Sequence, residues 1–144
     1  MNESGYTAPD LTLVGQSHVN VYRATNGEVG YLWNGAPTLL LTSKGRRTGE
    51  SRTSALLFGR DGDEYLVVAS MGGAPRHPQW YLNLTANPEA EVQVRADHIP
   101  VVARTATPAE KPRLWEVVTG VWPNYEVYQE RTAREIPVVV LSPQ

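Results

Sequence analysis

The sequence contains no cysteine and only three histidines. Without cysteine, neither a disulfide framework nor a thiolate metal site can form. His18, His77 and His98 stand far apart in the sequence, which argues against a histidine-rich metal site. We therefore expect no bound metal, and the composition is compatible with a reducing compartment.

The chain also lacks a strong net charge and a long apolar run. Its formal net charge is −2, which does not indicate a protein that binds nucleic acid. No run is long enough to span a membrane, and residues 1–13 lack the basic start and apolar stretch of a signal peptide. We expect a cytoplasmic protein with a small ligand.

A chain of 144 residues has the length of one ordinary domain. Gly5, Pro9 and small polar residues predict a loose arm over residues 1–10. Asp10 is then the expected N-cap of a helix over residues 11–23. Within a single domain, we separate an N-terminal arm and helix, residues 1–36, from a main coenzyme-binding unit, residues 37–144.

Short apolar runs separated by turn residues follow Pro37. Such short connections are typical of antiparallel strands, and they favour a small β-barrel over a parallel fold. The expected class is α+β, mainly β, with a six-stranded antiparallel sheet and peripheral helices. The six strands are expected at residues 38–42, 54–58, 65–70, 91–95, 99–103 and 136–141, with Ala96 and Asp97 at one turn.

Three further helices are predicted from their start and stop signals. Pro75 and Pro78 precede a helix expected over residues 77–86. Thr107 and Glu110 form a capping box that opens a helix ended by Pro123. A short helix is expected over residues 124–131.

Residues 43–52 form a basic, glycine-containing connection between two predicted strands. Two glycines let the backbone approach a ligand closely, and guanidinium groups suit bidentate contact with phosphate or carboxylate. A solvated hairpin turn with charges at its tip is the alternative. The candidate anion-binding residues are Lys44, Arg46, Arg47, Thr48, Gly49 and Arg52.

A second candidate site lies where a strand leaves through glycines and enters a helix, at residues 69–81. Ser70 and the exposed backbone amides of such a junction can bind the polar edge of a planar heterocycle, with Trp80 or Tyr81 packed nearby. A glycine-rich turn without a ligand is the alternative. His77 stands between two prolines with no acidic partner beside it, which favours a structural or surface role over that of a general base.

Aromatic residues are dense between residues 115 and 128. Trp115 is interpreted as a core residue. Tyr125 and Tyr128 follow a polar break, so their phenols are candidates for a pocket wall and for donating a proton or hydrogen bond. Tyr31 and Trp33 are interpreted as packing, with a lid over a site as the alternative.

From about residue 37 to residue 143, these features resemble the deazaflavin (F420)-dependent nitroreductase family, group A of the flavin/deazaflavin oxidoreductases. The resemblance implies a split β-barrel and coenzyme F420. Three residues depart from the family pattern: Met71 and Leu57, where a lysine-containing loop and a tyrosine are usual, and Trp122, where a tyrosine is found. The matching blocks are residues 40–42, 45–49, 52, 60–62, 69–70, 72–74, 78, 80–84, 86–88, 134 and 136–140.

The same resemblance implies residue roles. The basic turn is expected around the coenzyme's phosphate and acidic tail, and residues near the strand-to-helix junction are expected around the deazaflavin. Trp122, Tyr125 and Tyr128 are expected to border the substrate pocket. The residues assigned to coenzyme binding are Lys44, Arg46, Arg47, Thr48, Gly49, Arg52, Ser54, Ala69, Ser70, Met71, Gly72, Gly73, Trp80 and Asn83.

We therefore expect a reductase that passes a hydride from reduced F420 to a planar electrophile, such as a quinone, an enone or a nitro compound. Tyr125 is the first candidate for the catalytic phenol and Tyr128 the second. One alternative is a non-catalytic carrier of a flavin, deazaflavin or lipid-like molecule. FMN is the less favoured coenzyme, because the arginine cluster exceeds what one phosphate needs. Lipophilic acceptors would favour a loose membrane association, and the oligomeric state stays open.

Overall fold

The computed structural model of the protein describes residues 6–144. Of the arm predicted over residues 1–10, residues 1–5 thus lie outside the described residues. The described chain combines helices with one mainly antiparallel sheet, which confirms the α+β class. Its four α-helices are α1 (Gly15–Thr25), α2 (Gln79–Ala86), α3 (Lys111–Val121) and α4 (Asn124–Glu130).

The sheet has eight strands, so the expected count of six is wrong. All six predicted strands are present, but two very short strands were missed because two or three residues are too few to show a periodic pattern. The strands are β1 (Leu32–Trp33), β2 (Ala36–Lys44), β3 (Ser51–Leu57), β4 (Gly59–Asp61), β5 (Glu64–Val68), β6 (Glu89–Val94), β7 (Asp97–Thr105) and β8 (Val138–Pro143).

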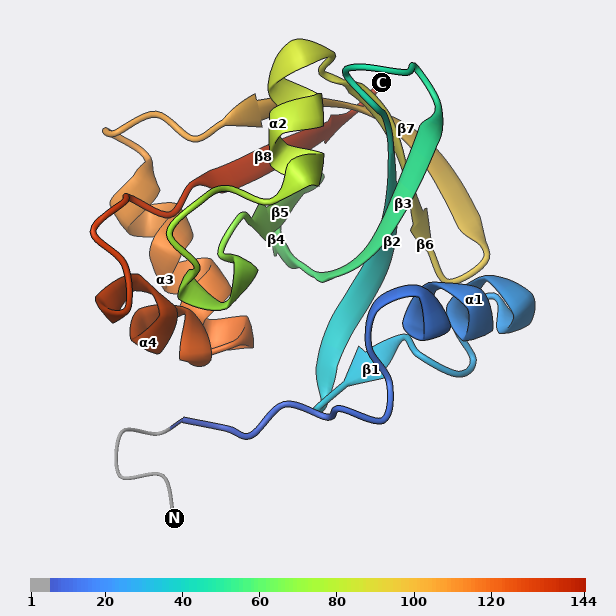
Figure 1. The fold of residues 1–144 in the computed structure, drawn as a ribbon, viewed down its shortest axis with the longest axis horizontal. Coiled ribbons are helices and arrows are strands. Elements are labelled where there is room, and N and C mark those ends of the chain that lie inside the picture. The colour runs from blue at the N-terminus through green and yellow to red at the C-terminus, as the bar shows by residue number, and fades with distance from the viewer. Residues whose placement is uncertain (1–5) are drawn as a thin grey trace.

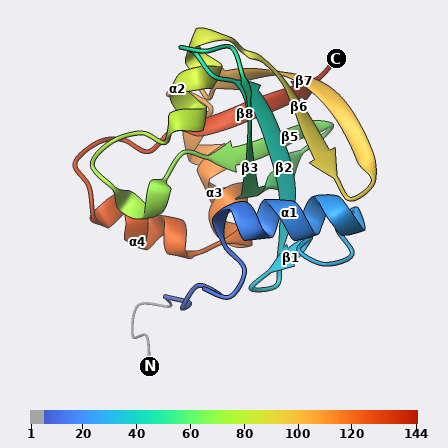
Figure 2. The ribbon, with the colours of Figure 1, turned by 45° about the vertical axis from the view of Figure 1, so that its right-hand side comes forward.

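All strand pairs in the described residues are antiparallel, in the order β1-β2-β6-β7-β8-β5-β4, with β3 also paired to β2. The sheet curls into an open half-barrel (Figures 1 and 2). β1 and β3 each pair only with β2, and β4 pairs only with β5, so one edge of the half-barrel is formed by β3 with the short β1, and the other by β4. The opening between them faces the loop after β5.

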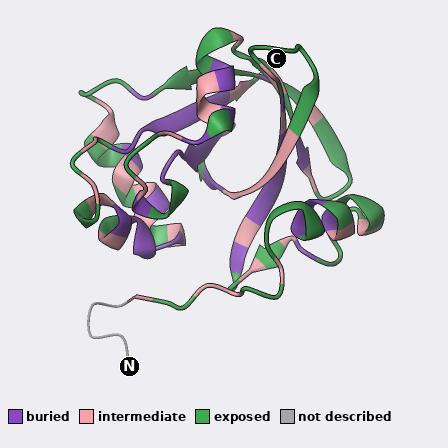
Figure 3. Ribbon diagram, viewed as in Figure 1, coloured by how far each residue is buried: buried purple, intermediate pink, exposed green. Residues whose placement is uncertain are grey.

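Alternation along β5 sends side chains to two apolar clusters. Tyr65 and Val67 face the barrel interior, where Trp80 and Leu84 of α2 also pack. Leu66 and Val68 face the opposite side, which α3 and α4 cover. A third, small cluster joins α1 to β2. Figure 3 shows the buried residues concentrated on β2 and β8 and on the inner faces of the helices.

Helix α1 begins later than predicted, at Gly15, and Asp10 is not its N-cap. The Asp10 carboxylate instead accepts a hydrogen bond from the backbone N–H of Thr12 at 2.9 Å, which caps a local turn before the helix. The N-cap is Val14, whose side chain makes no capping bond. The indole N–H of Trp33 donates to the carbonyl of Leu13 at 2.7 Å and so ties this segment to β1.

Other boundaries shift by a few residues. Helix α2 begins at Gln79 rather than at 77, because Pro78 is extended and serves as its N-cap. The capping residues Thr107 and Glu110 form a turn that precedes α3. The turn between β6 and β7 falls one residue earlier than predicted, since Asp97 already belongs to β7. Within the described part of the chain, no helix is long and apolar enough to cross a membrane.

Candidate functional site

Two cavities meet at the opening of the half-barrel. The first, called here the aromatic cavity, has a volume of about 510 Å³ and lies between β3, the loop after β5 and the aromatic residues of α4 and of the segment just before it. The second, called here the basic cleft, has a volume of about 580 Å³ and is walled by the β2–β3 turn, β3 and α2. Ser54, Gln79 and Trp80 line both cavities. One elongated ligand can therefore occupy both.

The β2–β3 turn forms a hairpin, as the sequence predicted. Gly45 donates its N–H to the carbonyl of Glu50, and Gly49 donates to the carbonyl of Gly45, each at 2.8 Å. Gly49 has a φ of 75°, a left-handed conformation that favours glycine. The hydroxyl of Thr48 accepts a hydrogen bond from the N–H of Glu50 at 3.1 Å. These bonds hold the turn over the basic cleft.

Arg46 connects this turn to α2. Its guanidinium donates to Asn83 Oδ1 and to Gln79 Oε1, both at 2.9 Å, and its backbone N–H also donates to Asn83 Oδ1. Arg47 and Arg52 line the cleft as well, and neither forms an ion pair within residues 6–144. The cleft thus holds guanidinium groups that have no direct ion-pair partner in the described part of the chain.

The loop after β5 carries an unusual backbone. Met71 has a φ of 47°, a conformation that is rare for a residue with a side chain. Gly72 and Gly73 also have positive φ, and a Cβ on Gly73 would lie 2.6 Å from the carbonyl oxygen of Tyr128. The N–H groups of Ser70, Met71 and Gly72 donate no hydrogen bond within residues 6–144. Successive free amides of this kind form a concavity that attracts electronegative atoms.

Arg134 lines neither cavity, and its side chain binds this loop. Its guanidinium donates to the carbonyls of Ser70 and Ala74, each at 2.8 Å. A third bond goes to the carbonyl of Ala69 at 3.2 Å and a fourth to Nδ1 of His77 at 3.1 Å. Burial, and secondly the charge of Arg134, lower the pKa of His77. His77 lines neither cavity.

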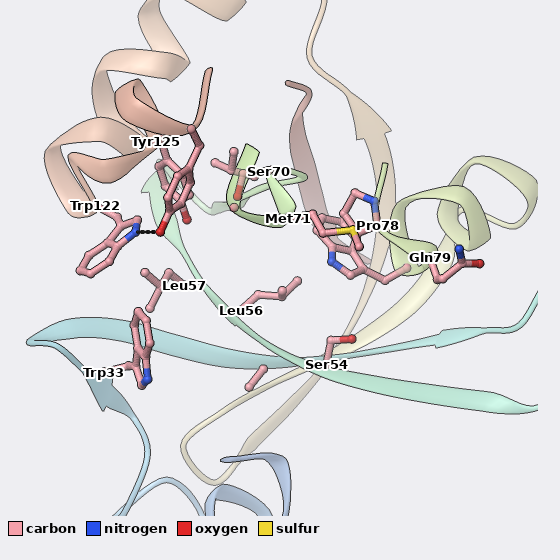
Figure 4. Close-up of a pocket in the computed structure, with 15 residues that line it drawn as sticks. Trp33, Ser54, Leu56, Leu57, Ser70, Met71, Pro78, Gln79, Trp122 and Tyr125 are labelled. Atoms are coloured by element: carbon pink, nitrogen blue, oxygen red, sulfur yellow. Dashed lines mark hydrogen bonds between the residues drawn. The ribbon is translucent and has the colours of Figure 1, made fainter. Parts of the chain in front are cut away.

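Aromatic side chains form one wall of the aromatic cavity (Figure 4). The indole N–H of Trp122 donates to the hydroxyl of Tyr128 at 3.3 Å, and the rings of Tyr125 and Tyr128 pack edge to face at 6.1 Å between centroids. Burial, with a smaller contribution from Tyr128, raises the pKa of Tyr125 well above its usual range. Tyr125 is therefore a neutral phenol that can donate a hydrogen bond.

Most of the predicted site residues line one of the two cavities, and four do not. Lys44 is exposed at the end of β2 and Gly49 is exposed in the β2–β3 turn, whereas Ala69 and Gly73 are buried in the segment after β5. The predicted residues that line a cavity are Arg46, Arg47, Thr48, Arg52, Ser54, Ser70, Met71, Gly72, Trp80, Asn83, Trp122, Tyr125 and Tyr128.

The sequence did not identify several lining residues. Trp33 was interpreted as packing, but it lines the aromatic cavity and packs against Trp122 at 5.3 Å between centroids. Gln79 and Leu56 line the same cavity, and Gln16 of α1 reaches the basic cleft. No local pattern marks these residues, because only the curl of the sheet brings them to the site. No group of potential metal ligands gathers within residues 6–144.

Comparison with known proteins agrees with this geometry. A sequence model described as F420H(2)-dependent quinone reductase matches residues 14–143. The chain belongs to this family. An F420H(2)-dependent quinone reductase of Mycobacterium tuberculosis is 47% identical over 129 residues, which cover 87% of each chain. Together these matches confirm the resemblance inferred from the sequence.

Two solved structures share the fold and much of the sequence. One, described as an F420-H2 dependent reductase (FDR-A), is 36% identical with a TM-score of 0.69 and covers 74% of this chain and 94% of its own. Another, described as a domain-swapped dimer, is 32% identical with a TM-score of 0.72 and covers 88% of this chain and 94% of its own. The first structure supports the family assignment, and both support the fold.

Proposed function

We propose that this protein is an F420H2-dependent reductase that passes a hydride to a quinone. The observation that carries the proposal is the junction of the basic cleft with the aromatic cavity at Ser54, Gln79 and Trp80. This arrangement suits a coenzyme with an acidic tail and a planar ring, together with a planar acceptor beside that ring. Membership of the F420H(2)-dependent quinone reductase family supports the same assignment.

The residues of the basic cleft fit the phosphate and carboxylates of F420. Arg47 and Arg52 supply guanidinium groups without an ion pair inside residues 6–144, and Thr48 lies beside them. Arg46 is already bonded to α2, so we assign it to shaping the cleft. FMN carries one phosphate and leaves part of this positive charge unused.

The residues at the junction of the cavities fit the deazaflavin ring. Trp80 offers an apolar surface, while Ser54 and the free amides of Ser70 and Met71 offer polar groups for the ring's heteroatoms. These amides belong to the backbone. They therefore do not depend on the lysine that the family usually has in this loop, where this chain has Met71. When bound, the reduced deazaflavin supplies the hydride at its C5 position. We propose that the coenzyme binds along the junction of the two cavities, at the opening of the half-barrel.

The aromatic cavity is proposed to hold the acceptor. Reduction of a quinone to a hydroquinone takes a hydride and a proton, so the acceptor oxygen needs a hydrogen-bond donor. We assign this role to the phenol of Tyr125, which burial keeps neutral, and a supporting role to Tyr128. Trp122, Leu56 and Leu57 provide flat apolar walls. Enones and nitro compounds share the planar shape and the polarisable oxygen, and belong to the same substrate proposal.

The test is a direct assay of coenzyme oxidation. The purified protein is mixed with reduced F420 and a panel of quinones, enones and nitroaromatics, and the return of the oxidised deazaflavin absorbance is followed. We expect turnover that is fastest with quinones and that is lost when FMN replaces F420. The Arg47→Ala, Arg52→Ala double variant is the matched control, and it should turn over only at higher coenzyme concentration.

Three outcomes of this assay separate the alternatives. Tight binding of F420 without oxidation by any acceptor would favour a carrier instead of an enzyme. Tighter binding and turnover with FMN would assign a different coenzyme. Oxidation at the background rate together with no binding would remove the proposal as a whole.

A further inference from the structure

Arg134 lies between α4 and β8, is half-buried, and lines neither cavity. Its guanidinium nevertheless makes its hydrogen bonds to the loop that borders the aromatic cavity, at the carbonyls of Ala69, Ser70 and Ala74. A single side chain that binds three carbonyls of one loop constrains the orientation of its peptide groups. Arginine suits this task because its planar guanidinium presents donors in fixed directions.

The direction of the carbonyls fixes the direction of the amides. All peptide bonds of residues 6–144 are trans, and in a trans peptide the C=O and N–H point in opposite directions. Because the carbonyls of Ala69 and Ser70 point toward Arg134, the N–H groups of Ser70 and Met71 point away from it. Ser70 and Met71 line the aromatic cavity, on the other side of the loop.

The third amide of the row is oriented by a hydrogen bond within the loop. The carbonyl of Met71 accepts the N–H of Ala74 at 3.1 Å, so the N–H of Gly72 faces the opposite direction. Gly72 also lines the aromatic cavity, and none of the three amides donates a hydrogen bond within residues 6–144. The loop therefore presents a short row of free donors beside the junction of the two cavities.

This arrangement needs an external support. Met71 is in the left-handed region, with a φ of 47°, which an L residue avoids when nothing holds it there. The tight contact of Gly73 with the backbone of Tyr128 holds one end of the loop. The bonds of Arg134 to Ala69 and Ser70 hold the other end.

We propose that Arg134 is a positioning residue of the coenzyme site, which turns the N–H groups of Ser70 and Met71, next to the free amide of Gly72, toward the polar edge of the deazaflavin ring. This inference rests on the proposed function. Arg134 touches neither coenzyme nor acceptor, and it acts through the loop. Its loss should weaken contacts to the ring while it leaves contacts to the acidic tail unchanged.

The experiment compares two ligands and two sites. The ligands are complete F420 and the deazaflavin riboside head that lacks the phosphate and the acidic tail. Arg134→Lys and Arg134→Gln should each weaken the binding of both ligands by the same factor, about tenfold, because oriented hydrogen bonds to the ring are lost. Arg47→Ala, the matched control, should weaken the binding of complete F420 and leave the head unaffected.

Further readouts separate positioning from general destabilisation. At saturating coenzyme, the KM for the quinone should stay unchanged in the Arg134 variants. Guanidinium ion added to an Arg134→Ala variant should restore part of the affinity for the head. If an Arg134 variant binds the head as tightly as the parent, or loses affinity for complete F420 only, the inference is wrong.

A measurement on the unaltered protein covers the case in which the variants do not fold. In NMR titrations with the head, the backbone amide resonances of Ser70, Met71 and Gly72 should move downfield, as expected for amides that gain an acceptor. Unchanged resonances on saturation with the head would overturn the inference. If neither ligand binds the unaltered protein at all, the proposed function itself fails, which is a different result.

Discussion

The indole rings of Trp33 and Trp122 pack at 5.3 Å between centroids, and both line the aromatic cavity. Trp33 belongs to the short strand β1, whereas Trp122 follows directly after α3. Part of the proposed acceptor site therefore comes from the region before β2. Trp33 also holds the segment before α1 in place through its bond to the carbonyl of Leu13.

Replacing Trp33 by Ala should enlarge the aromatic cavity and remove the packing that supports Trp122. Aromatic pairs contribute about 0.5–1.5 kcal/mol beyond their buried area, so we expect kcat/KM for small quinones to fall about fivefold. Affinity for F420 should not change, because Trp33 does not line the basic cleft. Trp33→Phe keeps a ring in place and should show a smaller effect. A loss of coenzyme affinity in Trp33→Ala would contradict this division of the site.

The phenol of Tyr125 is the proposed donor to the acceptor oxygen, so Tyr125→Phe should lower kcat/KM for quinones by about a hundredfold. Burial raises the pKa of Tyr125, which means that the protonated donor persists from neutral through mildly basic pH. The wild-type rate should therefore show no loss from ionisation of this phenol in that range. Steady-state kinetics of Tyr125→Phe beside Tyr128→Phe provide the test. A larger loss in Tyr128→Phe would exchange the two roles.

The sequence predicted the parts of the fold that depend on local chemistry. The glycines at 45 and 49 indicated the β2–β3 hairpin, and the structure confirms that turn. The start of α1 was wrong because the side chain of Asp10 has a competing local use, the bond to Thr12. Strand β1 was missed because its two residues carry no pattern of their own.

The site was harder to predict because its residues meet only in the folded chain. Basic and aromatic residues could be selected by type, which is how Arg52 and Tyr125 were chosen. The sequence did not show that the guanidinium of Arg46 is hydrogen-bonded to Asn83, or that the ring of Trp33 packs against that of Trp122. These relationships depend on how the sheet curls and on where α2 docks. Which residues bind the coenzyme stays a prediction.

Gly73 and Gly72 form a matched pair for testing how tightly the loop after β5 is held. Both have positive φ, but only at Gly73 would a Cβ approach backbone atoms, at 2.6 Å from the carbonyl oxygen of Tyr128. Gly72→Ala should cost about 1 kcal/mol of unfolding free energy from its left-handed backbone alone. Gly73→Ala should cost about 3 kcal/mol or more, because the loop and α4 must separate. Urea denaturation of the two variants measures the difference, and equal losses would show that the loop is held loosely.

Arg47 and Arg52 offer the sharpest test of the basic cleft, because neither pairs with a carboxylate of residues 6–144. Each charge-assisted contact to a phosphate or carboxylate contributes about 1.5–3 kcal/mol, so Arg47→Ala and Arg52→Ala should each weaken F420 affinity about tenfold or more. Stability should hardly change, since exposed arginines without an ion pair contribute little to it. Wild-type affinity should fall as salt rises, and the double variant should lose most of that dependence. Titrations at low and high salt, with a melting curve for each variant, measure these effects. If the double variant melts like the parent and binds F420 as tightly as the parent does at both salt concentrations, Arg47 and Arg52 do not bind the coenzyme. The residue assignments in the basic cleft would then be wrong.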